Sequence, residues 1–173
     1  AIAVRYVDGL LVKAWTRKGI DKTYCMRMIE DLPKHIIAKG TVDIRGELYG
    51  KGLIPARSQR LAAGHLRKKQ PSGMGLSFCA FQILDGKGTE VSNLEQLVKW
   101  GFHVCGYIKI DKDVVNRVKK LHSQWQDSLI FSRYPTDGIV IKVLDKDLQD
   151  KIGRTSIAPS WATAIKDTWK KTW

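Results

Sequence analysis

The chain has 173 residues, and its 30 Lys and Arg outnumber its 17 Asp and Glu, which gives a formal charge of +13. A hydrophobic content of 43% excludes a disordered chain of the weakly hydrophobic kind, and no apolar run approaches the ~20 residues that cross a bilayer. The three scattered cysteines and four histidines show no C-x-x-C pair and no zinc-ligand spacing, so we expect a reducing, cytoplasmic setting without structural metal.

A hairpin is predicted at the start of the chain. Two β-favouring runs lie on either side of Asp8-Gly9, a pair that is typical of a two-residue turn. Residues 21–32 carry apolar side chains at mixed spacing and indicate neither helix nor strand. Residues 41–50 alternate as a strand, and 57–69 favour a helix whose middle consists of small residues.

The rest of the chain mixes strands and helices. Ser92 and Glu95 have the spacing of a capping box, which predicts that a helix begins at Ser92 and continues through Trp100. We expect one α+β domain over residues 1–173. The other predicted elements are strands over 76–84, 103–110, 137–143 and 159–166 and helices over 113–125 and 145–152.

The positive charge is concentrated in one run. Residues 57–70 contain five basic side chains and no acid. A surplus of +13 favours a polyanionic partner, of which nucleic acid is the commonest, although solvated surface lysines would give the same count. The basic side chains of this run are Arg57, Arg60, Arg67, Lys68 and Lys69.

Four further side chains are unremarkable when each is considered alone. Lys142 closes an apolar strand, as does Lys166, and such lysines are usually solvated. Glu47 fits a surface carboxylate paired with Arg45 or a neighbouring lysine, and Phe81 fits a core position.

Their joint pattern is more specific. The segments are Asp43-Ile-Arg-Gly-Glu-Leu48, Ala62-Ala-Gly-His-Leu-Arg67, Asp137-Gly-Ile-Val-Ile-Lys-Val143 and Ala158-Pro-Ser-Trp-Ala-Thr-Ala-Ile-Lys166. In this order they resemble the E-V-R-G-E-V, A-A-G-S-L-R, D-G-V-V-I-K-V and A-P-R-W-A-x-A-x-K segments of the adenylation (nucleotidyltransferase) domain of NAD-dependent DNA ligases. The resemblance covers nearly the whole chain and implies the antiparallel sheets and flanking helices of that domain.

The resemblance implies an enzyme of DNA replication and repair that seals nicks. In this family AMP passes from NAD to a lysine amine, then to the 5′-phosphate of nicked double-stranded DNA, and a 3′-hydroxyl finally displaces it. Negative charge grows on phosphorus at each step, so fixed cations around the phosphate are expected to supply much of the catalysis. The implied cofactors are NAD, through its AMP moiety, and Mg²⁺.

The implied roles follow the motifs. Lys142 and Lys166 would hold the phosphate or the adenine edge, and Glu47 and Arg17 would contact the ribose. Phe81 stands where the family has an aromatic ring stacked on adenine. Lys142, Lys166 and Glu47 are therefore the expected catalytic residues, and no metal ligand is assigned.

The basic run carries the implied contacts to DNA. Arg67 matches the family's A-A-G-x-L-R element and would touch the nucleotide phosphate and the DNA backbone, with Arg60 as a looser match. Lys68 and Lys69 extend the same surface.

The largest departure from the family is the missing K-x-D-G segment, because the position two before Asp8 is Tyr6. We therefore expect the nucleophilic lysine and the nicotinamide-binding region on a second polypeptide or on missing segments, and the chain alone to be inactive. A split phage-type ligase, a fragment, and a degenerate fold acting as a non-catalytic basic DNA-binding subunit remain open. Ser160 replaces the usual arginine, and either Gln126 or Arg133 fills another expected arginine site.

Overall fold

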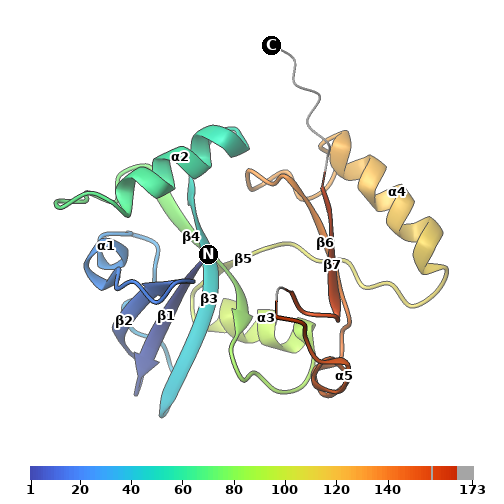
Figure 1. The fold of residues 1–173 in the computed structure, drawn as a ribbon, viewed down its shortest axis with the longest axis horizontal. Coiled ribbons are helices and arrows are strands. Elements are labelled where there is room, and N and C mark those ends of the chain that lie inside the picture. The colour runs from blue at the N-terminus through green and yellow to red at the C-terminus, as the bar shows by residue number, and fades with distance from the viewer. Residues whose placement is uncertain (157, 167–173) are drawn as a thin grey trace.

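The computed structural model describes residues 1–156 and 158–166, which form a five-stranded sheet and, beside it, a two-stranded sheet (Figure 1). The large sheet has the strand order β2-β1-β3-β4-β5 and is antiparallel except where β5 runs parallel to β4. This mixture confirms the predicted α+β class. The strands of the large sheet are β1 (Ile2–Val7), β2 (Leu10–Thr16), β3 (Thr41–Gly50), β4 (Leu76–Ile83) and β5 (His103–Val104).

Three helices accompany the large sheet. They are α1 (Thr23–Arg27), α2 (Pro55–His65) and α3 (Glu90–Lys99). The predicted hairpin at Asp8-Gly9 is confirmed, with both residues at positive φ, as a two-residue turn between right-twisted strands requires.

The hydrophobic core lies on one face of this sheet. Val4, Tyr6 and Ile44 have no exposed surface, and Phe78 packs edge-on against Phe102. The stretch that the sequence left undecided contributes α1 and then an irregular segment whose apolar side chains fill the same core. Its fully or almost fully buried members are Met26, Ile29 and Leu32.

The small sheet is built differently. It pairs β6 (Gly138–Lys142) with β7 (Ala162–Lys166), and helices α4 (Val114–Gln126) and α5 (Lys146–Ile152) lie beside it (Figure 1). None of these four elements adds a side chain to the buried hydrophobic core. Among the described residues after Phe102, Gln149 alone is buried.

Two predicted elements are shorter than expected. The strand expected over 103–110 is only His103–Val104, because the chain leaves the sheet at a glycine, Gly106, that packs beneath the ring of Phe131. The last strand begins at Ala162 rather than 159, because the preceding residues form a turn closed by the bridge between Arg154 and Pro159.

Two helix boundaries also differ from the prediction. Helix α2 ends at His65, since the amides of Arg67 and Lys68 bond three residues back in a tightened final turn. Helix α3 is capped by Thr89, whose hydroxyl accepts from the amide of Ser92 while the Ser92 hydroxyl accepts from the amide of Thr89. The capping box is therefore one turn earlier than predicted.

No helix in the part of the chain that the structure describes has the length and apolar content needed to span a membrane.

Candidate functional site

The sheet face opposite the core carries two of the predicted site residues. Leu48 and Phe78 point into the core, so their strand neighbours Glu47 and Cys79, which are register partners, point to the other face. Gly46 lacks a side chain at the point where the Phe78 ring lies against β3, and a Cβ there would clash with that ring. The glycine of the Arg-Gly-Glu motif therefore leaves room for the Phe78 ring on the core side of β3, next to Glu47 in sequence.

Phe81 reaches this face through an irregularity in β4. Gly46 pairs with Ala80 and Arg45 with Gln82, so Phe81 is the extra residue of a β-bulge. Bulges change the direction in which a side chain points. The Phe81 ring is partly exposed and meets a side chain from the small sheet, the ammonium group of Lys142, at 5.8 Å from the ring centroid. The structure thus brings together two predicted nucleotide contacts, Phe81 and Lys142.

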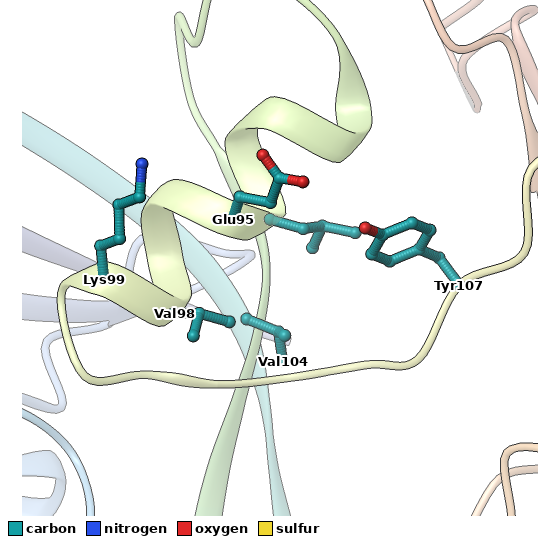
Figure 2. Close-up of a pocket in the computed structure, with 6 residues that line it drawn as sticks. Glu95, Val98, Lys99, Val104 and Tyr107 are labelled. Carbon is teal, nitrogen blue, oxygen red and sulfur yellow. The ribbon is translucent and has the colours of Figure 1, made fainter.

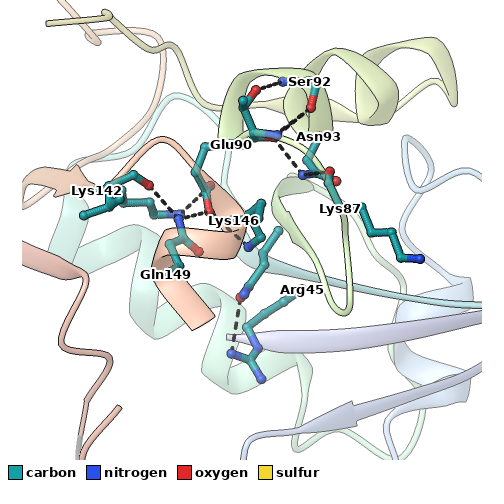
Figure 3. Close-up of polar contacts among 11 residues, drawn as sticks. Arg45, Lys87, Glu90, Ser92, Asn93, Lys142, Lys146 and Gln149 are labelled. Atoms are coloured by element: carbon teal, nitrogen blue, oxygen red, sulfur yellow. Dashed lines mark hydrogen bonds and ion pairs between the residues drawn. The ribbon is translucent and has the colours of Figure 1, made fainter. Parts of the chain in front are cut away.

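Lys142 is also bound to a residue that the sequence analysis missed. Its Nζ lies 3.3 Å from Oε2 of Glu90, the first residue of α3 (Figure 3). Glu90 is only 8% exposed. An acidic residue in the first turn suits the positive end of the helix dipole, but its burial requires cations or donors nearby.

Those donors come from α5. Oε1 of Glu90 accepts a hydrogen bond from Nε2 of Gln149 at 2.8 Å and lies 3.3 Å from Nζ of Lys146 (Figure 3). Burial raises the pKa of Glu90, but the Gln149 hydrogen bond and the charges of Lys142 and Lys146 outweigh it, so the pKa lies below its usual value. Glu90 is therefore a buried carboxylate that stays ionised.

Backbone bonds fix this cluster. The amide of Glu90 donates to the carbonyl of Leu144 at 2.8 Å, and the amide of Lys146 donates to the carbonyl of Gly88 at 3.0 Å. The second donor hydrogen of Gln149 serves the carbonyl of Val143 at 2.6 Å. The start of α3 is consequently joined to the end of β6 and the start of α5.

Glu47 lies apart from this cluster. Its side chain is 59% exposed and pairs with the amine of Ala1, 3.1 Å away, rather than with Arg45, which donates to Gln82 at 3.4 Å. The pairing expected between Glu47 and Arg45 is therefore wrong. Arg17 is exposed in the turn after β2, at the same end of the sheet, because Ile2 pairs with both Thr16 and Gly46.

The remaining predicted residues are exposed and lie away from Glu90. Lys166 pairs with Asp137 at 3.2 Å, and the register sets it opposite Gly138, four residues along the strand from Lys142. At ~3.3 Å per residue the two lysines are roughly 13 Å apart on one face of the small sheet. The structure does not bring them together. The basic side chains of α2 and the turn after it are also exposed: Arg60, Arg67, Lys68 and Lys69.

An apolar surface pocket lies elsewhere. It has a volume of about 320 Å³ and lies between α3 and the chain after β5 (Figure 2). None of the predicted nucleotide contacts belongs to it. Its lining residues are Leu94, Glu95, Val98, Lys99, Val104 and Tyr107.

The described residues contain no group of three or more His, Cys, Asp or Glu that could hold a metal ion. The sequence implied Mg²⁺ without naming ligands, and these side chains do not form a protein-only site for it. Cys79 and Cys105 are held as thiols, since burial raises the pKa of Cys79 to about 12 and also raises that of Cys105. The side chains that the structure brings together here are lysines, a carboxylate, an amide and one aromatic ring.

Sequence reasoning missed Glu90, Lys146 and Gln149. Their only sequence signals were an acid at the start of an amphipathic helix and polar residues within a seven-residue helix. Both are ordinary surface patterns, and only the meeting of α3 with α5 buries them.

Comparison with known proteins points to the same family that the sequence motifs resemble. The family described as NAD-dependent DNA ligase adenylation domain matches residues 1–169. A DNA ligase of Cytophaga hutchinsonii is 29% identical over 194 residues, covering 96% of this chain and 29% of that protein. A DNA ligase of Halothermothrix orenii is 30% identical over 187 residues, covering 93% and 28%. The chain therefore spans less than a third of the length of these relatives.

Proposed function

Because the chain belongs to the NAD-dependent DNA ligase adenylation-domain family, we propose that it forms the AMP pocket of a nick-sealing DNA ligase. The proposed domain comprises residues 1–173, of which 157 and 167–173 lie outside the described residues. The proposal is supported above all by the meeting of Lys142 with Phe81, which sets a cation beside an aromatic face between the two sheets.

This arrangement suits a nucleotide for simple reasons. An aromatic ring that is partly exposed can stack a free face on a purine, and a lysine close to the ring can neutralise the adjoining phosphate. We propose that Phe81 stacks on adenine and that Lys142 binds the phosphate. Glu47, exposed on the same sheet face, would accept a hydrogen bond from a ribose hydroxyl, with Arg17 at the same end of the sheet.

The lysine that receives AMP would come from outside these 173 residues, on the same or on a second polypeptide. In support, the 173 residues contain no K-x-D-G sequence. Ala1 lies against Glu47, so a segment joined there would enter directly at the proposed ribose contact. NAD would be the AMP donor, and Mg²⁺ is expected from the family without any residue assigned to it.

The proposed macromolecular substrate is nicked double-stranded DNA. The exposed basic side chains of α2 and its following turn would contact the phosphate backbone, and affinity should fall steeply with salt. Lys166 would join the phosphate contacts once it leaves Asp137, an exchange that its 66% exposure allows.

The first experiment measures AMP binding to the chain by calorimetry or by NMR titration. We expect Lys142→Ala and Phe81→Ala each to weaken binding by about ten-fold, the equivalent of about 1.4 kcal/mol. Lys109→Ala, which removes an exposed lysine between β5 and α4, is the matched control and should leave affinity within two-fold. Equal affinities in all four proteins would refute the pocket.

A second experiment tests the division of labour. Mass spectrometry after incubation with NAD and Mg²⁺ should find no AMP adduct on the chain alone. Nick sealing should appear when a polypeptide bearing the K-x-D-G lysine is added, and Lys142→Ala and Glu47→Ala should each reduce it. An adduct on the chain alone, or sealing that ignores both substitutions, would contradict the proposal. DNA binding without sealing would favour the non-catalytic DNA-binding subunit.

A further inference from the structure

We propose that Glu90 is the resting partner of Lys142 and that Lys146 is a positioning residue that sets how tightly Glu90 holds it. Lys146 would thereby tune the affinity of the pocket for a nucleotide phosphate without touching the nucleotide. This inference rests on the proposed function in so far as it gives Lys142 a phosphate to bind.

The two oxygens of Glu90 are used unequally. Oε2 is 3.3 Å from Nζ of Lys142 and accepts no other hydrogen bond from the described residues. Oε1 takes both the Gln149 amide at 2.8 Å and Nζ of Lys146 at 3.3 Å. Lys142 can therefore leave while the buried carboxylate keeps one cation and one hydrogen-bond donor.

The two lysines differ in where they face. The side chain of Lys142 is 27% exposed and lies beside Phe81, whereas that of Lys146 is 12% exposed and lies over the ring of Trp161 at 5.5 Å. Lys146 is also fixed through its amide to Gly88. Lys142 is thus the one that can turn to a ligand, and Lys146 stays with Glu90.

A competition follows from this geometry. An incoming phosphate must draw Lys142 away from Glu90, and that carboxylate attracts Lys142 less while Lys146 neutralises part of its charge. Without Lys146, Lys142 is the sole cation paired with the buried Glu90 carboxylate. If Lys142 then moves to a phosphate, the negative charge of Glu90 is left without a cation. Loss of Lys146 should therefore weaken phosphate binding, but only while Glu90 is ionised.

The test is a double-mutant cycle on AMP affinity, followed by NMR titration so that weak binding is measurable. Lys146→Met keeps the aliphatic stem and should weaken AMP binding about five-fold, whereas in a Glu90→Gln background the same change should alter it less than two-fold. If Lys146 acted only through its positive charge near the pocket, Lys146→Met would weaken AMP binding by the same factor in both backgrounds. That result would overturn the proposal.

A readout without nucleotide separates this inference from the proposed function. The ε-methylene signals of Lys142, assigned with Lys142→Arg, should shift in opposite directions in Lys146→Met and Glu90→Gln. Glu95→Gln, an exposed carboxylate on the same helix, should leave them in place. If the Lys142 signals do not shift in Glu90→Gln, the resting pair is refuted, whatever the measured AMP affinities are. If the Lys142 signals do shift in Glu90→Gln but Phe81→Ala leaves AMP affinity unchanged, the proposed AMP pocket is refuted instead.

Discussion

The two halves of the molecule are held together by different forces. Residues 1–104 enclose side chains such as Tyr6, Phe78 and Leu97, which are buried almost completely. Residues 105–156 and 158–166 bury one residue, and it is polar, Gln149. The large-sheet half has its own hydrophobic core. The described part of the small-sheet half has the backbone pairing of β6 with β7 and polar contacts with the first half, but no buried hydrophobic residue.

Those contacts gather at a few places. The hydroxyl of Tyr134 donates to the carbonyl of Val104 at 2.8 Å, and its ring packs edge-on against Tyr49. The Glu90 cluster and the meeting of Lys142 with Phe81 form the other junctions. The lesson is that Lys142, on which the proposed chemistry depends most, lies on the half without a buried hydrophobic core and contacts the first half at the junction.

The largest expected effect is the loss of a core ring in the first half. Phe78→Ala empties the space between β3, β4 and Phe102, and should lower the free energy of unfolding by about 3–5 kcal/mol. Urea denaturation followed by circular dichroism measures this. A loss below about 1 kcal/mol would mean that the core does not carry the stability of the large sheet.

The next largest effect is expected at the junction. Glu90→Ala leaves two cations and the Gln149 amide without their shared partner, and breaking a buried pair costs about 3 kcal/mol. Because the change lies between the halves, we expect the amides of β6 and β7 to exchange hydrogen faster while those of β1 and β3 keep their rates. Hydrogen exchange by mass spectrometry distinguishes the two. Equal acceleration in both sheets would contradict the division.

A smaller effect is expected from pH. The pKa of Glu90 in the folded chain is lower than its ordinary value of 4.5, so its ionised form favours folding. That contribution is complete above pH 4.5 and disappears as pH falls through the lowered pKa. Thermal unfolding from pH 7 to pH 3 should show a steeper loss of stability in the natural chain than in Glu90→Gln. If stability fell equally with pH in both proteins, Gln149, Lys142 and Lys146 would not be lowering the pKa of Glu90.

The contrast between halves also explains what could be predicted from sequence. Strands β1 to β4 and β6 follow local sequence patterns, and the Asp8-Gly9 pair between two β-favouring runs predicted the first hairpin. Strand β5 was overestimated because its apolar residues satisfy a strand pattern even where no neighbouring strand remains to pair with them. Local pattern reports what a segment prefers and not whether a partner is available.

The candidate site divides in the same way. Lys142, Phe81 and Glu47 were identified by resemblance, and Lys142 and Phe81 meet in the structure while Glu47 shares the sheet face. Glu90 was missed because its surroundings come from segments more than fifty positions away, including Gln149. A buried charge cluster depends on tertiary contacts, so no local sequence pattern predicts it.

The smallest expected effect, at Val140, belongs to the sharpest comparison, which makes the same change in both halves. Val4→Ala in β1 removes two methyl groups from a site with no exposure and should cost about 2–3 kcal/mol. Val140→Ala in β6 makes the identical change at a site that is 59% exposed and should cost less than about 1 kcal/mol. Urea denaturation of the two variants beside the natural chain measures both values. If they agreed, the small sheet would have a hydrophobic core equivalent to that of the large one, and Lys142 would not need the Glu90 junction to hold it in position.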